Sequence, residues 1–163
     1  MKIPWSVALL LTVTVGCGPS EDQVRSLVQA ELARASTIEH ITDADVIGPY
    51  SPAVTAGNFV FISGQIGLLP ESMQFAGDDI EAQTRQVMNN LMKVLAKTGC
   101  DSSDVVQCTV FLRDINDYQK MNLIYGGYFG QSSYPSRMAV EVSNLPRNAL
   151  VEISAIAYKR STP

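Results

Sequence analysis

The chain has 163 residues, of which 46% are hydrophobic and 17% are charged. This length suits one globular domain with short appendages, because domains commonly hold about 100–150 residues. The formal net charge is −4, and the acidic residues are scattered along the chain. No basic surface is therefore expected to neutralise phosphates, and nucleic acid is not expected as a partner.

Residues 1–16 have the composition of an export signal. Lys2 precedes the apolar run Val7–Val15, which is shorter than the about 20 residues that a spanning helix needs. The following TVGC, Thr14–Cys17, resembles the lipobox of bacterial lipoproteins, where cleavage before the cysteine exposes it for acylation. We expect a signal peptide over 1–16, lipidation of Cys17, and an exported protein anchored to the periplasmic or extracellular face of a bacterial membrane. An ordinary secretory peptide with a coincidental cysteine is the alternative.

Residues 17–40 are expected to link the lipid to the domain. The spacing of apolar residues over Ser20–Ser36 predicts a helix, and Ser20 with Gln23 fits a capping box. The apolar stripe is narrow, which favours a spacer that holds the domain clear of the membrane over a partner-binding helix.

The remaining cysteines and the single histidine do not form a recognisable reactive set. Cys100 follows a predicted helix end and Cys108 lies in a predicted strand, so we expect two free, mostly buried thiols. His40 falls in the predicted linker. A metal site and a Ser-His or Cys-His nucleophile are therefore poorly supported, and no cofactor is expected.

The domain is predicted over residues 41–160, beginning with a strand and a long helix. Residues 58–64 alternate as a strand, with Phe59, Phe61 and Ser63 on one face. Residues 78–98 then repeat apolar side chains at helical spacing, and Asp78 is the expected N-cap. Gly99 is the expected stop of this helix.

Further elements complete a mixed α and β pattern. We expect strands over 105–112, 137–142 and 150–158, and a second helix over 117–128. The order β-β-α-β-α-β-β predicts an α+β sheet with two helices packed on one face. The other face then needs cover, and oligomerisation is the simplest way to supply it.

Polar residues stand at three positions where the strand pattern otherwise indicates burial. Arg137 shares a strand face with Ala139 and Glu141, and Glu152 shares one with Ser154. Ser63 ends the phenylalanine-rich strand. Taken singly, such charges are more simply interpreted as keeping a sheet edge soluble.

A resemblance to a known family changes that interpretation. Successive segments between residues 41 and 158 resemble blocks of the Rid family, also called the YjgF or reactive intermediate deaminase family. The segments are GPYSPAV, FVFISGQIGLLP, GDDIEAQTRQVMNNLMKVLAKTG, VVQCTVFLRDINDYQKMNLIYGGYF, YPSRMAVEVSNLP and ALVEISAIAY. Their order and spacing cover essentially the whole predicted domain.

The resemblance implies a chorismate-mutase-like α+β fold and a homotrimer with a small-molecule site in each cleft between subunits. By the family pattern, Arg137 holds the substrate carboxylate and Glu152 orders the hydrolytic water. Tyr50, Ser63 and Asn122 match the other residues around the pocket. The chain departs from the pattern at Ala139, where several members have cysteine, and at Pro52, where many have glutamine.

The chemistry of an arginine and a glutamate side chain is consistent with these roles, independently of the resemblance. A planar guanidinium binds a carboxylate through two parallel hydrogen bonds, and a carboxylate can hold and deprotonate a water. We therefore expect hydrolytic deamination of small 2-imino or enamine acids to 2-keto acids and ammonia, as in a 2-iminobutanoate/2-iminopropanoate deaminase. A non-catalytic module for small carboxylates and a trimeric holdase at the cell envelope are the alternatives. Glu141 is expected to be structural, and the endoribonuclease role attached to the family's name is disfavoured by the acidic charge balance.

Overall fold

The computed structural model describes residues 18–35, 37–42 and 46–160. The predicted signal peptide and the predicted lipidation site Cys17 lie outside these residues, so both remain predictions. None of the helices in the described ranges is long and apolar enough to cross a membrane. The chain divides between Ala33 and Arg34 into two units, which are described separately.

The first unit carries most of helix α1, Glu21–Ala35. Its N-terminus has the predicted capping box, in which the Gln23 N–H donates to Ser20 Oγ at 3.2 Å and the Ser20 N–H donates to Gln23 Oε1 at 2.8 Å. Val24 and Val28 are about half exposed, and Leu27 and Leu32 are 65% exposed. The helix is therefore confirmed, and its role as a spacer remains a prediction.

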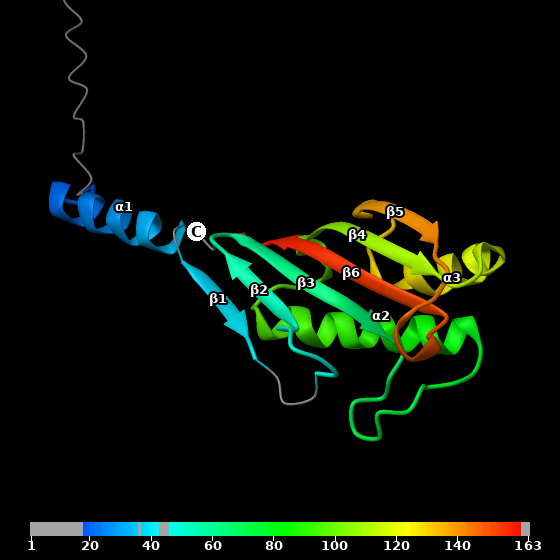
Figure 1. Ribbon diagram of the computed structural model, residues 1–163. Helices are drawn as coiled ribbons and strands as arrows, with labels where there is room; N and C mark the ends of the chain where they lie inside the picture. Colours follow the sequence, from blue (N-terminus) through cyan, green and yellow to red (C-terminus); the bar gives the residue numbers. More distant parts are fainter. Residues whose placement is uncertain (1–17, 36, 43–45, 161–163) are drawn as a thin grey trace, which may run out of the picture. The chain divides into compact units, whose positions relative to one another are not determined.

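The second unit is built on a mixed sheet, in which the described residues form six strands in the order β1-β2-β3-β6-β4-β5 (Figure 1). Neighbouring strands are antiparallel except for the parallel pair β4 and β5. The strands are β1 Ile38–Ile41, β2 Ala53–Ala56, β3 Phe59–Ile66, β4 Val105–Leu112, β5 Ser136–Glu141 and β6 Val151–Tyr158.

Strand β1 is an element that the sequence did not reveal. His40, predicted to lie in a linker, is a strand residue that pairs with Val54 of β2. Four residues are too few to show a two-residue period, and three of the four are exposed, so β1 has no alternation of apolar and polar side chains. It is held by main-chain pairing with β2, and Ile41 packs against the core.

Two helices lie on one face of the sheet, α2 over Ile80–Lys97 and α3 over Tyr118–Tyr125 (Figure 1). The N-cap of α2 is Asp79 and not the predicted Asp78, because the Asp79 carboxylate accepts from the Ala82 N–H at 2.7 Å. Gly99 ends the helix region at φ +77°, as predicted. Helix α3 is shorter than predicted and is followed by the 3-10 turn Gly126–Tyr128. Other 3-10 turns span Ser102–Asp104, Ile115–Asp117 and Pro146–Asn148.

The core lies between these helices and the sheet. Met88, Leu91 and Leu95 of α2 are fully buried, together with inward residues of β4 and β6 such as Val110 and Ile153. Cys100 and Cys108 are buried and free, as predicted. The predicted α+β fold with helices on one sheet face is therefore confirmed.

The opposite face of the sheet carries apolar side chains that stay exposed in the single chain. Phe59 and Phe61 of β3 are 46% and 45% exposed, and Tyr158 of β6 and Met138 of β5 are 40% and 52% exposed. Phe59 and Tyr158 pack edge to face, with ring centroids 5.3 Å apart. We name this surface, formed by Phe59, Phe61, Met138, Val140 and Tyr158, the open sheet face.

Candidate functional site

Strand β5 places Arg137 on the helix side of the sheet. Arg137 pairs with the buried Cys108 of β4, so its side chain points toward α3. There Arg137 Nη2 donates to Tyr118 Oη at 2.9 Å. The guanidinium carbon also lies 4.7 Å from the centroid of the Tyr125 ring and 5.5 Å from that of Tyr118. The guanidinium is thus fixed by one hydrogen bond and two aromatic faces.

Arg137 opens onto a surface recess that we name the arginine recess. It is lined by Ile115, Asn116, Tyr118, Gln119, Arg137 and Ala139. Among the described residues, the guanidinium has no acidic partner. A half-buried cation without an anion is suited to bind one from outside the chain.

The groups behind Arg137 are neutral at physiological pH. Burial, followed by the adjacent Cys108 thiol, raises the pKa of Tyr125. Burial likewise raises the pKa of Cys108. Both groups stay protonated at pH 7, so they leave the charge of Arg137 uncompensated.

Asn122 contacts Tyr118, which lines the arginine recess. It lies one helical turn after Tyr118, and its amide is the main cause that lowers the pKa of Tyr118, followed by the charge of Arg137. Its Oδ1 is buried without a hydrogen-bond partner in the described part of the chain. Asn122 therefore reaches the Arg137 group but does not itself line the recess.

Glu152 lies on the other face of the sheet. It pairs with Phe111 of β4, and Phe111 is three residues from Cys108, the partner of Arg137. Side chains an odd number of residues apart point to opposite faces of a strand. Within one chain, therefore, the carboxylate of Glu152 and the guanidinium of Arg137 point away from each other.

The space for Glu152 comes from an irregularity in β3. The register between β3 and β6 shifts between Ile62 and Gln65, so Ser63 and Gly64 form a β-bulge next to Glu152. A Cβ at residue 64 would come within 2.7 Å of Glu152 Cδ. Only glycine at this position leaves the carboxylate where it is.

Glu152 belongs to a second recess, of about 200 Å³, that we name the glutamate recess. It is lined by Ile47, Tyr50, Ser63, Gly64, Ile66, Pro146 and Glu152. The Ser63 hydroxyl donates to the Ser51 carbonyl at 2.7 Å, which ties the loop that carries Tyr50 to the bulge. Tyr50 lines the recess and is 44% exposed.

The Glu152 carboxylate is desolvated without being paired. Burial raises its pKa, and it has no hydrogen-bond partner among the described residues. A carboxylate in this state keeps its full capacity to accept a proton or to hold a water.

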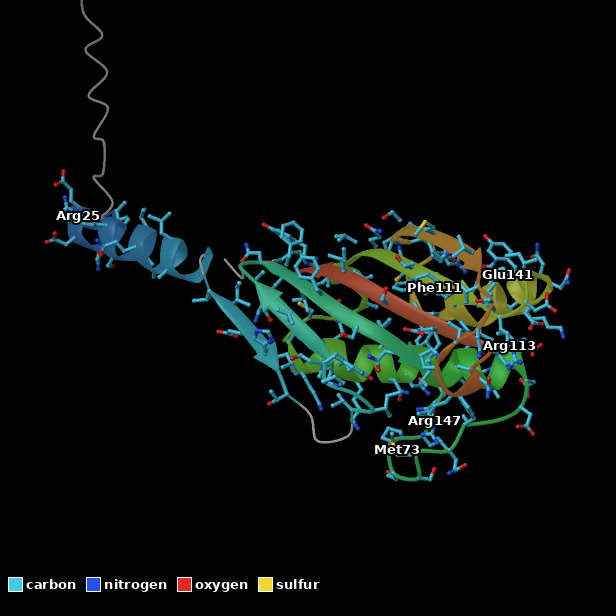
Figure 2. The ribbon with its side chains drawn as sticks, in the orientation of Figure 1. Arg25, Met73, Phe111, Arg113, Glu141 and Arg147 are labelled. Atoms are coloured by element: carbon cyan, nitrogen blue, oxygen red, sulfur yellow. The ribbon has the colours of Figure 1, made fainter. Side chains whose placement is uncertain are left out.

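The structure thus sorts the predicted site residues into two groups. Tyr50, Ser63 and Glu152 meet in the glutamate recess, and Asn122 and Arg137 meet around Tyr118. Glu141 is structural, as predicted, because its carboxylate accepts from the Ile115 N–H at 2.9 Å at the end of β5 (Figure 2). Within the described ranges, no group of three or more His, Cys, Asp or Glu is placed to hold a metal ion.

Sequence reasoning missed the aromatic support of Arg137 and the role of Gly64. Tyr118 and Tyr125 are seven residues apart and share one helix face, a spacing that could have indicated a paired aromatic surface for a cation. The approach of Gly64 to Glu152 has no local sequence signal, because it depends on the register between β3 and β6.

The fold and the two recesses define an α+β protein of the type that the sequence segments resembled. The family model described as Endoribonuclease L-PSP matches residues 40–159. The chain belongs to this family, which is the Rid or YjgF family of the sequence prediction.

Individual relatives support this membership. The chain is 52% identical to a RutC family protein of Pyrococcus horikoshii over 69% of its own length and 89% of that protein. It is 44% identical to a 2-iminobutanoate/2-iminopropanoate deaminase of Bos taurus, over 69% of this chain and 82% of the relative. The structure of E. coli TdcF with bound serine superposes with a TM-score of 0.70 at 33% identity, covering 75% of this chain and 99% of TdcF.

Proposed function

We propose that this protein hydrolyses small 2-imino acids to 2-keto acids and ammonia, at sites that two copies of the chain build together. One copy supplies the arginine recess and a neighbour in a homotrimer supplies the glutamate recess. The observation that carries the proposal is the pair of half-buried, uncompensated charges, Arg137 and Glu152, on opposite faces of one sheet.

The open sheet face supports self-association. Its five apolar side chains lie on β3, β5 and β6, on the sheet face that also carries Glu152, and Phe59, Phe61, Met138 and Tyr158 are each about half exposed or close to it. Covering apolar surface stabilises an assembly by about 25 cal/mol per Å². Exposed apolar side chains next to a charged recess are typical of a subunit interface.

The chemistry follows from the geometry of each recess. The Arg137 guanidinium binds the substrate carboxylate through two parallel hydrogen bonds, and the Tyr118 hydroxyl and the Tyr125 ring keep its orientation. This places the imine carbon against the glutamate recess of the neighbour.

Glu152 then carries the proton through the reaction. It takes a proton from a water whose oxygen adds to the imine carbon and passes that proton to the imine nitrogen, which gives a carbinolamine. Glu152 then takes the hydroxyl proton of the carbinolamine and delivers it to the same nitrogen, the C–N bond breaks, and ammonia leaves as the C=O bond forms. One water is consumed, and the carboxylate is regenerated.

A direct test uses the chain without residues 1–16 and imines released from alanine by an amino acid oxidase. We expect faster imine loss than in buffer, and Arg137→Ala is expected to abolish the acceleration while sedimentation shows the same assembly. Arg113→Ala is the matched control, because Arg113 donates to the Asn148 carbonyl outside both recesses. Absence of any acceleration by the unaltered protein would refute deamination. If calorimetry shows that pyruvate binds while no imine is hydrolysed, the non-catalytic module for small carboxylates is favoured instead.

The shared site is tested by mixing two inactive variants. Arg137→Ala keeps the glutamate recess and Glu152→Gln keeps the arginine recess, so a mixed assembly contains some complete sites. Random mixing in a cyclic assembly restores about one quarter of the sites. No recovery of activity after co-refolding would show that the two recesses do not meet across subunits.

We also propose that the chain is exported and attached through lipid on Cys17, a proposal that rests on the N-terminal sequence alone. It predicts that the mature protein begins at Cys17 and carries acyl chains. Mass spectrometry of the mature N-terminus checks this, and an uncleaved Met1 would contradict it.

A further inference from the structure

A second cavity adjoins the glutamate recess on the side of α2. Its volume is about 110 Å³, and it shares four lining residues with the recess, Ile47, Tyr50, Gly64 and Ile66. Gly64 is the wall closest to the reacting group, because a Cβ there would reach the Glu152 carboxylate. We name this space the side-chain cavity.

The walls of the side-chain cavity are held in place by hydrogen bonds. The Asn90 amide of α2 donates to the carbonyls of Ile66 at 3.1 Å and Leu68 at 2.9 Å. Met73, in the loop between β3 and α2 (Figure 2), also lines the cavity. The Met73 N–H donates to the Leu69 carbonyl at 2.8 Å. The cavity is therefore formed before any ligand enters.

Most of the polar groups that line the side-chain cavity already have hydrogen-bond partners. Both donors of the Asn90 amide are used on Ile66 and Leu68, and Asn90 Oδ1 accepts from Gln86 at 2.8 Å. The Gln65 amide donates to the Ser63 carbonyl at 3.0 Å. Lys93 lines the cavity from an exposed position of α2. Most other lining residues are aliphatic, among them Val46, Val94 and Met73.

We infer that the side-chain cavity receives the side chain of the substrate, and that it selects 2-imino acids with an apolar side chain of leucine or methionine size. This inference rests on the proposed deaminase site. An apolar cavity of about 150 Å³ holds benzene, so the smaller space here fits one branched or linear aliphatic group. The methyl of an alanine-derived imine leaves most of it unfilled.

Binding of the product keto acids tests the inference without requiring turnover. Calorimetry is expected to give a lower Kd for 4-methyl-2-oxopentanoate than for pyruvate. Val94→Phe places a ring in the cavity and is expected to reduce this preference by about tenfold or more, since one methylene in an apolar pocket is worth about 10- to 200-fold. The ratio of kcat/KM for leucine-derived and alanine-derived imines is expected to fall in parallel.

The matched control is Ala96→Phe, which adds similar bulk to α2 at an exposed position and is expected to leave the preference unchanged. Met73→Trp fills the cavity from the loop and replaces Val94→Phe should that variant not fold. Equal Kd values for the two keto acids, or binding of neither, would overturn the inference. Tighter binding of 2-oxoglutarate that is lost in Lys93→Gln would overturn it in favour of an acidic side chain.

If neither imine is hydrolysed while the keto acid preference and its loss in Val94→Phe are observed, the deaminase proposal fails and the cavity assignment stands. Hydrolysis of both imines, with a kcat/KM ratio that Val94→Phe and Met73→Trp leave unchanged, would support the deaminase proposal and refute the cavity assignment. The two proposals are therefore separable in one set of measurements.

Discussion

The arginine recess and the glutamate recess hold their charges in different ways. Arg137 is fixed by the Tyr118 hydroxyl at 2.9 Å and by two aromatic rings, on a strand and a helix. Glu152 has no such partner and lies where a β-bulge and a glycine make room for it. The difference indicates separate roles for the two recesses. The arginine recess is preorganised to bind the substrate, and the carboxylate of the glutamate recess remains able to accept a proton.

The largest expected effect comes from removing the proton acceptor. Glu152→Gln keeps the shape of the side chain, and we expect kcat to fall by about 10²- to 10⁴-fold because general acid–base catalysis contributes that much. Steady-state kinetics measures the loss, and KM is expected to change little because Arg137 still binds the carboxylate. Glu141→Gln is the control, since its side-chain oxygen still accepts from Ile115. Equal losses in the two variants would contradict the reacting role of the glutamate recess.

Displacing Glu152 without removing it is expected to have the next largest effect. Gly64→Ala pushes the carboxylate aside, and we expect kcat/KM to fall by about tenfold to hundredfold, because a displacement of about 1 Å can cost a hundredfold. Gly127→Ala is the matched control, because a Cβ there meets no atom within 4 Å. Wild-type kinetics in Gly64→Ala would show that the bulge does not position the acid.

Loosening the arginine recess is expected to weaken binding more than turnover. Tyr118→Phe keeps the ring but removes the hydroxyl that accepts from Arg137. We expect KM to rise by about tenfold, because a hydrogen bond to a charged group is worth about 1.5–3 kcal/mol. Tyr128→Phe makes the same chemical change where the hydroxyl lies within hydrogen-bond distance of two acceptors outside the recess, the Arg85 carbonyl and Asn89 Oδ1, and its kinetics should match the wild type. A fall in kcat at constant KM would overturn the assignment of binding to this recess.

The smallest effect concerns the titration of Glu152 and tests whether the recesses face each other. In the single chain, burial alone raises the pKa of Glu152, and a neighbouring guanidinium would oppose that rise. Arg137→Ala is therefore expected to raise the pKa of Glu152 in the assembled protein, as measured by carbon NMR of the side-chain carboxyl. An unchanged titration would place the two charges in separate environments.

The pKa of Glu152 also determines how kcat/KM falls at low pH. Glu152 must be deprotonated to accept the proton of water, so kcat/KM is expected to rise as pH rises through its pKa. For stability the sign is reversed: a carboxyl whose folded pKa is raised contributes stability below its unfolded pKa, and that contribution is lost as pH rises through the folded pKa. Glu152→Gln is expected to remove both dependences, which rate profiles and thermal melts over pH 4–7 check.

Much of the fold could be predicted from the sequence because its periodicities are strong. Strand β4 begins and ends where the alternation of residues 105–112 placed it, and the opposite facing of Phe61 and Ile62 in β3 follows from the two-residue period. Strand β1 and the N-cap Asp79 were not predicted, because four residues carry too little pattern and two adjacent aspartates fit the same cap signal equally well.

The residues of the candidate site were predicted through the family resemblance, but their arrangement could not be. The strand pattern shows which residues of one strand share a face. It does not show that the face of Arg137 and the face of Glu152 are opposite, since that depends on the pairing of both strands with β4. The contact between Gly64 and Glu152 depends on a register shift for the same reason.

Because the two recesses lie on opposite faces of the sheet, the number of complete sites depends on how the copies of the chain are arranged. A row of subunits joined recess to recess always ends with one idle cation and one idle anion, and only a closed ring uses every group. In the proposed ring, the loss of one member therefore destroys two active centres at once. Dilution would then abolish turnover more steeply than it reduces the mass of protein present.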